Sequence, residues 1–319
     1  MEAKRAPGCN RKGGNAVKRI ALSLFQPVML AVIVLFWAIA PAPLTQNPWT
    51  VIVATSLVTA IVVALEFVSE RHVSWRTNGR EFATDLLYTI LVATVIVKLV
   101  KKLADEPLAS AKHALGMSTL WVMHLPFIVQ VALMVFLIEF FQYWMHRAMH
   151  NSFLWWTHAP HHHITQLNAM KGAVGNPIEL FLVTISLVAL FDVPESAVFC
   201  ALTILTLVSS CAHANVRFDP PRWYSYVWTT IESHSKHHSA TYEDTRCNYA
   251  NSLILIDHVF GTFRDGESEI VGQDERKRLS IWQQFTFPLR PLIATIKARQ
   301  DRHPVDSRRF RPIPRRRQG

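Results

Sequence analysis

The sequence predicts an all-α integral membrane protein with about four transmembrane helices, a short helical hairpin and a histidine-rich helical cap on the cytoplasmic side. Half of the 319 residues are hydrophobic and only 18% are charged, which is unusual for a soluble domain. The hydrophobic residues form long blocks instead of alternating with polar ones. Basic residues gather at the two ends of the chain and account for much of the formal net charge of +10.

The apolar blocks predict the spans in order. Four of them approach the ~20 residues that cross a bilayer core: residues 20–40, 49–68, 83–100 and 121–144. The first block runs too long for a signal peptide and is expected to be retained. A shorter pair follows, residues 178–193 and 196–212, separated by Pro194. At ~1.5 Å rise per residue these two helices reach about 24–26 Å, so we expect a shallow hairpin that enters and leaves by the same face.

The basic residues predict orientation and domain organisation. Residues 1–19 form a basic cytoplasmic N-terminal tail, residues 20–265 the membrane-embedded domain with its motifs in 130–265, and residues 266–319 a basic cytoplasmic C-terminal tail. Lysines at the end of the third block and after it fit this orientation least well, because they would lie on the far side: Lys98, Lys101, Lys102 and Lys112. Beside apolar spans, basic ends are expected to contact anionic lipid headgroups and not nucleic acid.

Ten of the fifteen histidines lie between positions 146 and 238. Nine of them form four groups: His146 and His150 in "HRAMH", His158, His161 and His162 in "HAPHH", His213 in "CAHAN", and His234, His237 and His238 in "HSKHH". On a helix, positions i, i+3 and i+4 share a face, so we expect each H-x-x-H-H triplet to converge on one ion. Neutral imidazoles suit iron, zinc, copper and nickel. Nine are too many for one ion, which predicts two. The four cysteines include no C-x-x-C pair, so histidine is the expected ligand.

Other residues near these groups are candidates to support them, because a ligand histidine needs a partner for its second nitrogen. The candidate carboxylates are Glu139, Glu179, Glu232 and Asp257. Glu139 lies within an apolar block, where a carboxylate is costly; the alternative is an ion pair with Arg147 or a headgroup contact. Glu232 precedes the last triplet and could orient it or face water. His163 is expected to be a bystander or to support a ligand.

The motifs "HRxxH", "HxxHH", "HAN", "HxxHH", "NY" and "DxxFGT" resemble the fatty acid hydroxylase superfamily, also called the sterol desaturase family, over roughly residues 130–265. The last two read Asn248/Tyr249 and Asp257/Phe260/Gly261/Thr262. The resemblance implies a membrane-bound, non-haem di-iron oxidoreductase in which two iron ions use O2 to hydroxylate or desaturate a lipid, sterol, carotenoid or other hydrophobic substrate. Asn176 stands where many relatives have histidine, which leaves open the coordination number and whether Asn176 touches a metal.

The electron donor and an alternative function remain open from the sequence. The chain shows no fused haem-binding or dinucleotide motif, so electrons are expected from a separate ferredoxin, or from a cytochrome with its reductase. The alternative function is a metal transporter or metal-binding protein. Transport would favour ionisable residues near the midplane of several spans, whereas these histidines gather at span ends and in the cap, which favours catalysis. The substrate, the choice between hydroxylation and desaturation, and the oligomeric state stay undetermined.

Overall fold

The computed structural model describes residues 11–151 and 153–302. Within these residues the regular structure is helical, with two isolated β-bridges, Glu70–Val216 and Ser239–Val271. The prediction of an all-α fold is confirmed.

Five helical stretches are long and apolar enough to cross a membrane: Ala16–Ile39, Pro48–Val68, Gly79–Ala114, Phe127–His150 and Glu195–His213. The first belongs to α1 (Arg11–Ile39), and the second, fourth and fifth are α3, α7 and α10. The third joins α4 (Gly79–Leu91), α5 (Val97–Val100) and α6 (Glu106–Ala114) through two π-helical turns. The first four correspond to the predicted blocks. The fifth is the second arm of the expected hairpin, which forms a continuous helix of 19 residues.

Local sequence marks where these helices begin. The Asn47 side chain accepts a hydrogen bond from the backbone of Trp49 at the start of α3, and Asn78 does the same for Glu81 in α4. Pro126 and Pro194 directly precede α7 and α10. Asparagine satisfies a free N–H of the first helical turn, and proline cannot continue a preceding helix, so both define a boundary.

The expected hairpin forms, and its first arm is partly irregular. Its first arm is α9 (Pro177–Thr184) followed by extended backbone and a short 3-10 turn, and its second arm is α10. Asp192 at the tip forms an ion pair with Lys112 (2.6 Å) and accepts hydrogen bonds from Thr119. The tip therefore reaches the loop that follows α6. The irregular stretch after α9 extends the first arm, and Lys112 has its partner at the tip. The depth of the hairpin in the membrane stays a prediction.

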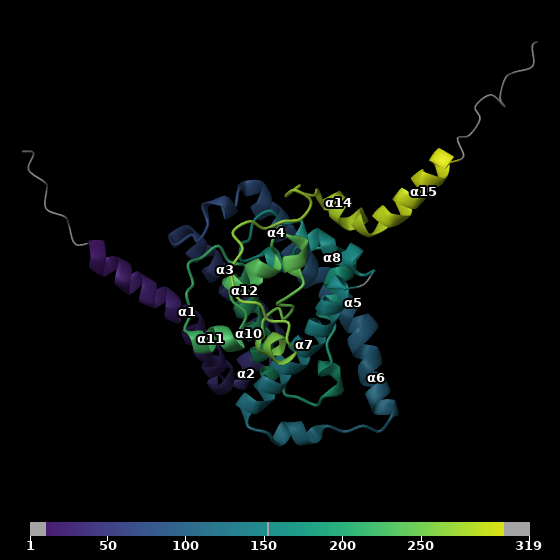
Figure 1. Cartoon of the computed structure of the whole chain (residues 1–319). Coiled ribbons are helices and arrows are strands. Elements are labelled where there is room, and N and C mark those ends of the chain that lie inside the picture. The colour runs from purple at the N-terminus through teal and green to yellow at the C-terminus, as the bar shows by residue number, and fades with distance from the viewer. Residues whose placement is uncertain (1–10, 152, 303–319) are drawn as a thin grey trace, which may run out of the picture.

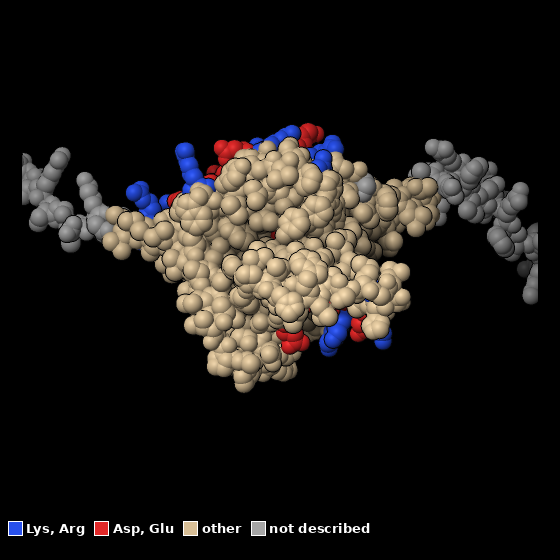
Figure 2. Space-filling view, turned by 90° about the horizontal axis from the view of Figure 1, so that it is seen from below, with Lys and Arg blue, Asp and Glu red and all other residues tan. Residues whose placement is uncertain are grey.

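Helix α10 is the centre of the bundle and packs against α1, α3 and α7 (Figure 1). Small buried residues allow this close packing: Ala197, Cys200, Ala201, Cys211 and Ala212. Figure 2 shows a broad surface without charged side chains, bordered by charged residues along its upper edge and by a smaller group along its lower edge. Such a band fits a lipid-facing surface, since charge is costly inside a bilayer.

Besides α2 (Ala42–Thr45), a single turn between α1 and α3, six further helices form a cap: α8 (Trp155–His162), α11 (Arg222–Val227), α12 (Ile231–His237), α13 (Leu255–Val259), α14 (Ile281–Thr286) and α15 (Arg290–Arg302). Residues beyond 265, assigned from sequence to the C-terminal tail, contribute to this cap. Val271, Leu279 and Phe287 are buried. The described part of this region thus packs on the helices that carry the histidines.

Candidate metal centre

Nine buried histidines form two groups, and in each group one ring nitrogen from every histidine lies within 4.8 Å of those of the others. Group one contains His146, His150, His158, His162 and His237. Group two contains His161, His213, His234 and His238. These are the nine residues predicted from sequence to bind metal, and helices α7, α8, α10 and α12 bring them together. Their role as ligands stays a prediction.

Each H-x-x-H-H triplet is divided between the groups. His158 and His162 lie in group one while His161 lies in group two, and His234 and His238 lie in group two while His237 lies in group one. The expectation that each triplet serves one ion is therefore wrong. At 3.6 residues per turn, positions i and i+4 nearly coincide in direction, whereas consecutive positions diverge by about 100°. Adjacent histidines thus point into neighbouring groups and join them.

The Nε2 atoms of several histidines converge. In group one, Nε2 of His158 lies 2.9 Å from Nε2 of His146 and 3.0 Å from Nε2 of both His150 and His162. In group two, Nε2 of His234 lies 2.9 Å from that of His213 and 3.1 Å from that of His238. The groups adjoin where the His162 and His238 rings stack, with centroids 4.6 Å apart.

Backbone carbonyls hold the opposite nitrogen of four of these rings. A carbonyl only accepts, so each Nδ1 carries the proton and each Nε2 presents a lone pair. The pairs are His146 with Tyr249 O, His161 with Val174 O, His213 with Ser209 O and His237 with Cys247 O, at 2.6–2.8 Å. Converging buried lone pairs repel one another unless a cation lies between them. This donor set therefore fits two metal ions.

Two further observations agree with that fit. First, burial lowers the pKa values of the candidate ligand histidines in and beside α8 and α12. The pKa of His158 is lowered to about 3. The pKa is lowered likewise for His161, His162, His234, His237 and His238. The imidazoles are thus neutral at pH 7, the form that binds metal. Nε2 of His237 is also buried without a hydrogen-bond partner among the described residues.

Glu179 supports group one directly. Its Oε1 lies 2.6 Å from Nδ1 of His158, and both side chains are buried. Asn176 begins α9: its Oδ1 accepts from the backbone of Ile178, and its own N–H donates to Glu179. Asn176 also donates to the carbonyls of Gln284 and Phe285. Asn176 therefore acts on Glu179 and the chain beyond 280, and not as a ligand.

Two other predicted carboxylates shape the loop after α12. Glu139 accepts hydrogen bonds from the backbone of Ser252 and Leu253, and not from Arg147. Asp257 accepts from the backbone of Tyr249 and Ala250. Because the Tyr249 carbonyl in turn accepts from His146, this loop orients a ring of group one.

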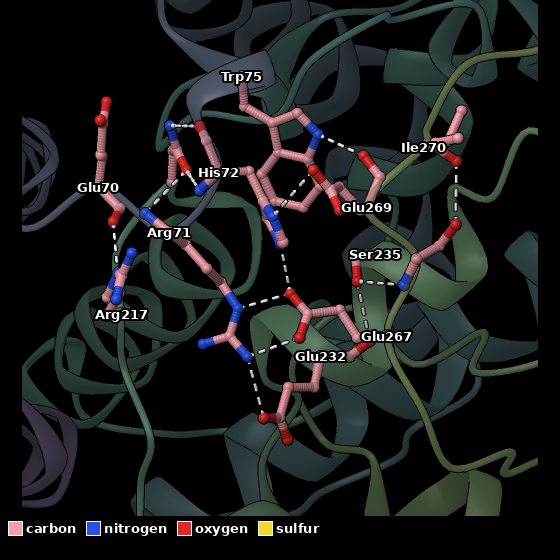
Figure 3. Close-up of polar contacts among 12 residues, drawn as sticks. Glu70, Arg71, His72, Trp75, Arg217, Glu232, Ser235, Glu267, Glu269 and Ile270 are labelled. Atoms are coloured by element: carbon pink, nitrogen blue, oxygen red, sulfur yellow. Dashed lines mark hydrogen bonds and ion pairs between the residues drawn. The ribbon is translucent and has the colours of Figure 1, made fainter.

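Glu232 takes the second of the two positions expected from the sequence, toward solvent. Its side chain is about half exposed and pairs with Arg71 at 3.0 Å instead of orienting a histidine. Figure 3 shows Arg71, from the loop between α3 and α4, pointing toward Glu232 and Glu267. Arg71 also pairs with Asp219 at 3.2 Å. Its backbone N–H donates to Asn215, two residues beyond His213. This network fastens the end of α10 and the start of α12, the helices that carry His213 and His234 of group two.

The sequence did not predict that the segment at Gly272 and Gln273 contacts the histidine groups. The Gly272 N–H donates to the carbonyl of His238 (3.2 Å), and the Gln273 N–H donates to that of His162 (2.8 Å). The Gln273 side chain donates to Ser239 O at 2.6 Å. This short segment therefore links one residue of each group. No sequence motif predicts this link. The only sequence signal is Gly272, which adopts φ +103°.

A buried cation, also unpredicted, lies beside group two. Lys171 Nζ pairs with Glu81 and Asp85 of α4, each at 2.7 Å. The neighbouring Gly172 faces His213, since a Cβ there would lie 3.2 Å from a ring carbon of His213. The Lys171 ion pairs thus hold a short 3-10 turn against a ring of group two.

His163 is directed away from the groups. Its Nδ1 donates to the carbonyl of Ala159, and its Nε2 lies 2.8 Å from Asp274. Trp155 and Trp156 lie on α8. Trp155 contacts the rings of His150 and His162, with centroids 5.2 and 5.5 Å away.

Comparison with known proteins supports the family resemblance found in the sequence. Residues 131–262 match the family model described as fatty acid hydroxylase. The chain is 24% identical to ornithine lipid hydroxylase OlsE of Rhizobium tropici over 233 residues, which covers 68% of this chain and 67% of that protein. No solved structure matches the chain significantly.

Two plant relatives match a shorter region. Protein CER1-like 1 of Arabidopsis thaliana is 27% identical over 39% of this chain and 22% of its own length. Very-long-chain aldehyde decarbonylase GL1-8 of Oryza sativa subsp. indica is 29% identical over 46% of this chain and 57% of its own length. The shared region therefore spans less than two thirds of either plant protein.

Proposed function

This chain is a membrane oxidoreductase of the fatty acid hydroxylase family, and from that premise we propose that it holds two iron ions and uses O2 to hydroxylate, or alternatively desaturate, a C–H bond of a lipid. The observation that carries the proposal is the convergence of nine buried histidines in two adjoining groups. An alkyl C–H bond offers no acid, base or leaving group, so an iron pair would supply the oxidant that side chains lack.

The chain's own residues would hold and shelter that centre. The five histidines of group one and the four of group two would present neutral nitrogens. Backbone carbonyls and Glu179 would keep the second nitrogen of each partnered ring oriented. Tyr143, Met149 and Leu207 are fully buried and belong to the surrounding helices α7 and α10. Such an apolar enclosure would exclude water from a reactive centre.

The relatives' names support a substrate with a long hydrocarbon chain, since they refer to an ornithine lipid and to very-long-chain aldehydes. We propose that the substrate enters from the bilayer. We further propose that the centre lies on the cytoplasmic side, where a separate ferredoxin or cytochrome would deliver the electrons. The metal-transport alternative has less support, because both groups are enclosed at one end of the helices instead of following a path across them.

Expression in a host supplied with candidate lipids tests the proposal. Lipid products from wild type are compared by mass spectrometry with those from His161→Ala in group two and from His113→Ala, an exposed histidine outside the groups. We expect wild type and His113→Ala to add one oxygen to a lipid, or to remove two hydrogens, and His161→Ala to lose this activity. Purified protein should contain two irons.

Metal analysis and transport measurements separate the two functions. Vectorial metal flux in vesicles, without lipid oxidation or oxygen consumption in the presence of a reductant, would favour the transporter and overturn the proposal.

A further inference from the structure

We propose that a pocket between α8 and the start of α15 binds the lipid substrate, and that it selects a headgroup carrying both a positive and a negative charge. The proposal rests on the proposed function, because it names the substrate class of that reaction. It follows from the position of the pocket, its walls and the charges at its rim.

The pocket has a volume of about 690 Å³, within the range of small-molecule sites. Its lining includes Trp155, Trp156 and Phe287, and the rings of Trp156 and Phe287 lie 6.1 Å apart. Pro291 and Ala294 of α15 add apolar surface. These walls suit the glycerol and upper acyl region of a lipid.

One side chain of the pocket wall also contacts group one. Trp155 lines the pocket and also contacts the rings of His150 and His162, with centroids 5.2 and 5.5 Å away. A lipid bound here would therefore have its chain next to the proposed metal centre.

Opposite charges meet at the rim. Arg290 lies over the Phe287 ring, with its guanidinium carbon 3.8 Å from the ring centroid. Its Nη1 lies 3.8 Å from Oδ2 of Asp274. His163 contacts the same carboxylate oxygen of Asp274 at 2.8 Å. The side chains of Asp274 and Arg290 are 63% and 42% exposed, so each keeps hydrogen-bonding capacity for a ligand. A singly charged headgroup would match one of them and face repulsion from the other, whereas a zwitterionic headgroup would match both.

The surroundings favour a lipid over a protein as the occupant. Figure 1 shows α15 projecting from the side of the molecule, near α8 and α14. Large apolar side chains of this region are exposed: Trp282, Leu289, Leu292, Ile293 and Ile296. Exposed apolar residues beside a rim of mixed charge are typical of a segment at the membrane interface.

The test uses the full chain in lipid nanodiscs with a reductant and an electron donor. Lipids with identical acyl chains and neutral, anionic, cationic or zwitterionic headgroups compete, and products are measured by mass spectrometry. We expect the zwitterionic lipid to be preferred, and Asp274→Lys or Arg290→Glu to reduce that preference about fivefold each, as for a partly exposed ion pair. Glu275→Lys and Lys277→Glu make the same charge changes on exposed neighbours outside the pocket and should keep the preference.

A second readout keeps the two proposals distinguishable. Native mass spectrometry of purified protein, with or without metal, measures which lipid each variant retains. If no lipid is oxidised but wild type retains zwitterionic lipid and Asp274→Lys does not, the proposed function fails and the pocket assignment stands. Oxidation that ignores the headgroup in wild type would overturn the pocket assignment alone. The variants could instead lose the same fraction of oxidation activity for every headgroup and regain it with excess electron donor. This result would assign the surface to the electron donor and would also overturn the pocket assignment.

Discussion

Substitution of Gly272 by alanine is expected to release metal from both histidine groups. Gly272 adopts φ +103°, and a Cβ at this position would lie 2.7 Å from the carbonyl oxygen of Ile164. Its N–H donates to His238, and the next N–H donates to His162. The added methyl group must push this segment away from Ile164. The two hydrogen bonds to ligand residues then lengthen or break.

The magnitude follows from these contacts. A non-glycine residue in this backbone region costs about 1–3 kcal/mol. Loss of the two hydrogen bonds adds about 1 kcal/mol each. The sum, about 3–5 kcal/mol, is a large part of the 5–15 kcal/mol that stabilises a typical domain. Because one bond goes to a residue of each group, the loss of metal should involve both ions.

Thermal unfolding in detergent and metal content by mass spectrometry measure the effect. Gly266→Ala is the matched control, since Gly266 also has a positive φ, +116°, but its Cβ would meet no atom within 4 Å. We expect the control to lose some stability through its backbone and to keep its metal. The reasoning is refuted if Gly272→Ala unfolds at the temperature of Gly266→Ala and retains both ions.

Three further predictions concern buried polar groups. Glu179→Gln replaces the carboxyl group that contacts Nδ1 of His158 and should weaken metal affinity about 10–100-fold, measured by chelator competition; unchanged affinity would show that the carboxyl group is dispensable. Lys171→Met leaves Glu81 and Asp85 buried without their shared cation and should cost about 3–5 kcal/mol; unfolding at the wild-type temperature would contradict this. Burial holds the pKa of His158 at about 3 in the folded protein, against ~6.5 in an unfolded chain. The unfolded state therefore binds more protons between these values, so the metal-free protein should lose stability as the pH falls from about 6.5 to about 3. Melting temperatures that stay constant over this window would count against a neutral buried ring.

The hydropathy and spacing of the sequence were enough to predict the local features. Long apolar blocks predicted helices, because a membrane-spanning segment must satisfy its backbone internally. The spacing of His146 and His150, or of His158 and His162, predicted rings on one helical face. The same helical geometry could have predicted that each triplet is divided between the two groups, since His161 and His162 point about 100° apart.

Only the tertiary structure decided which partners those local features meet. The contact of Asp192 with Lys112, the pairing of Glu232 with Arg71, and the bonds from Gly272 and Gln273 to the histidine segments join residues far apart in the chain. Helical periodicity reports which side chains share a face, but not which distant segment packs against it. That choice depends on how all the helices fill the core together, and here it determines how two sets of imidazoles come to lie side by side.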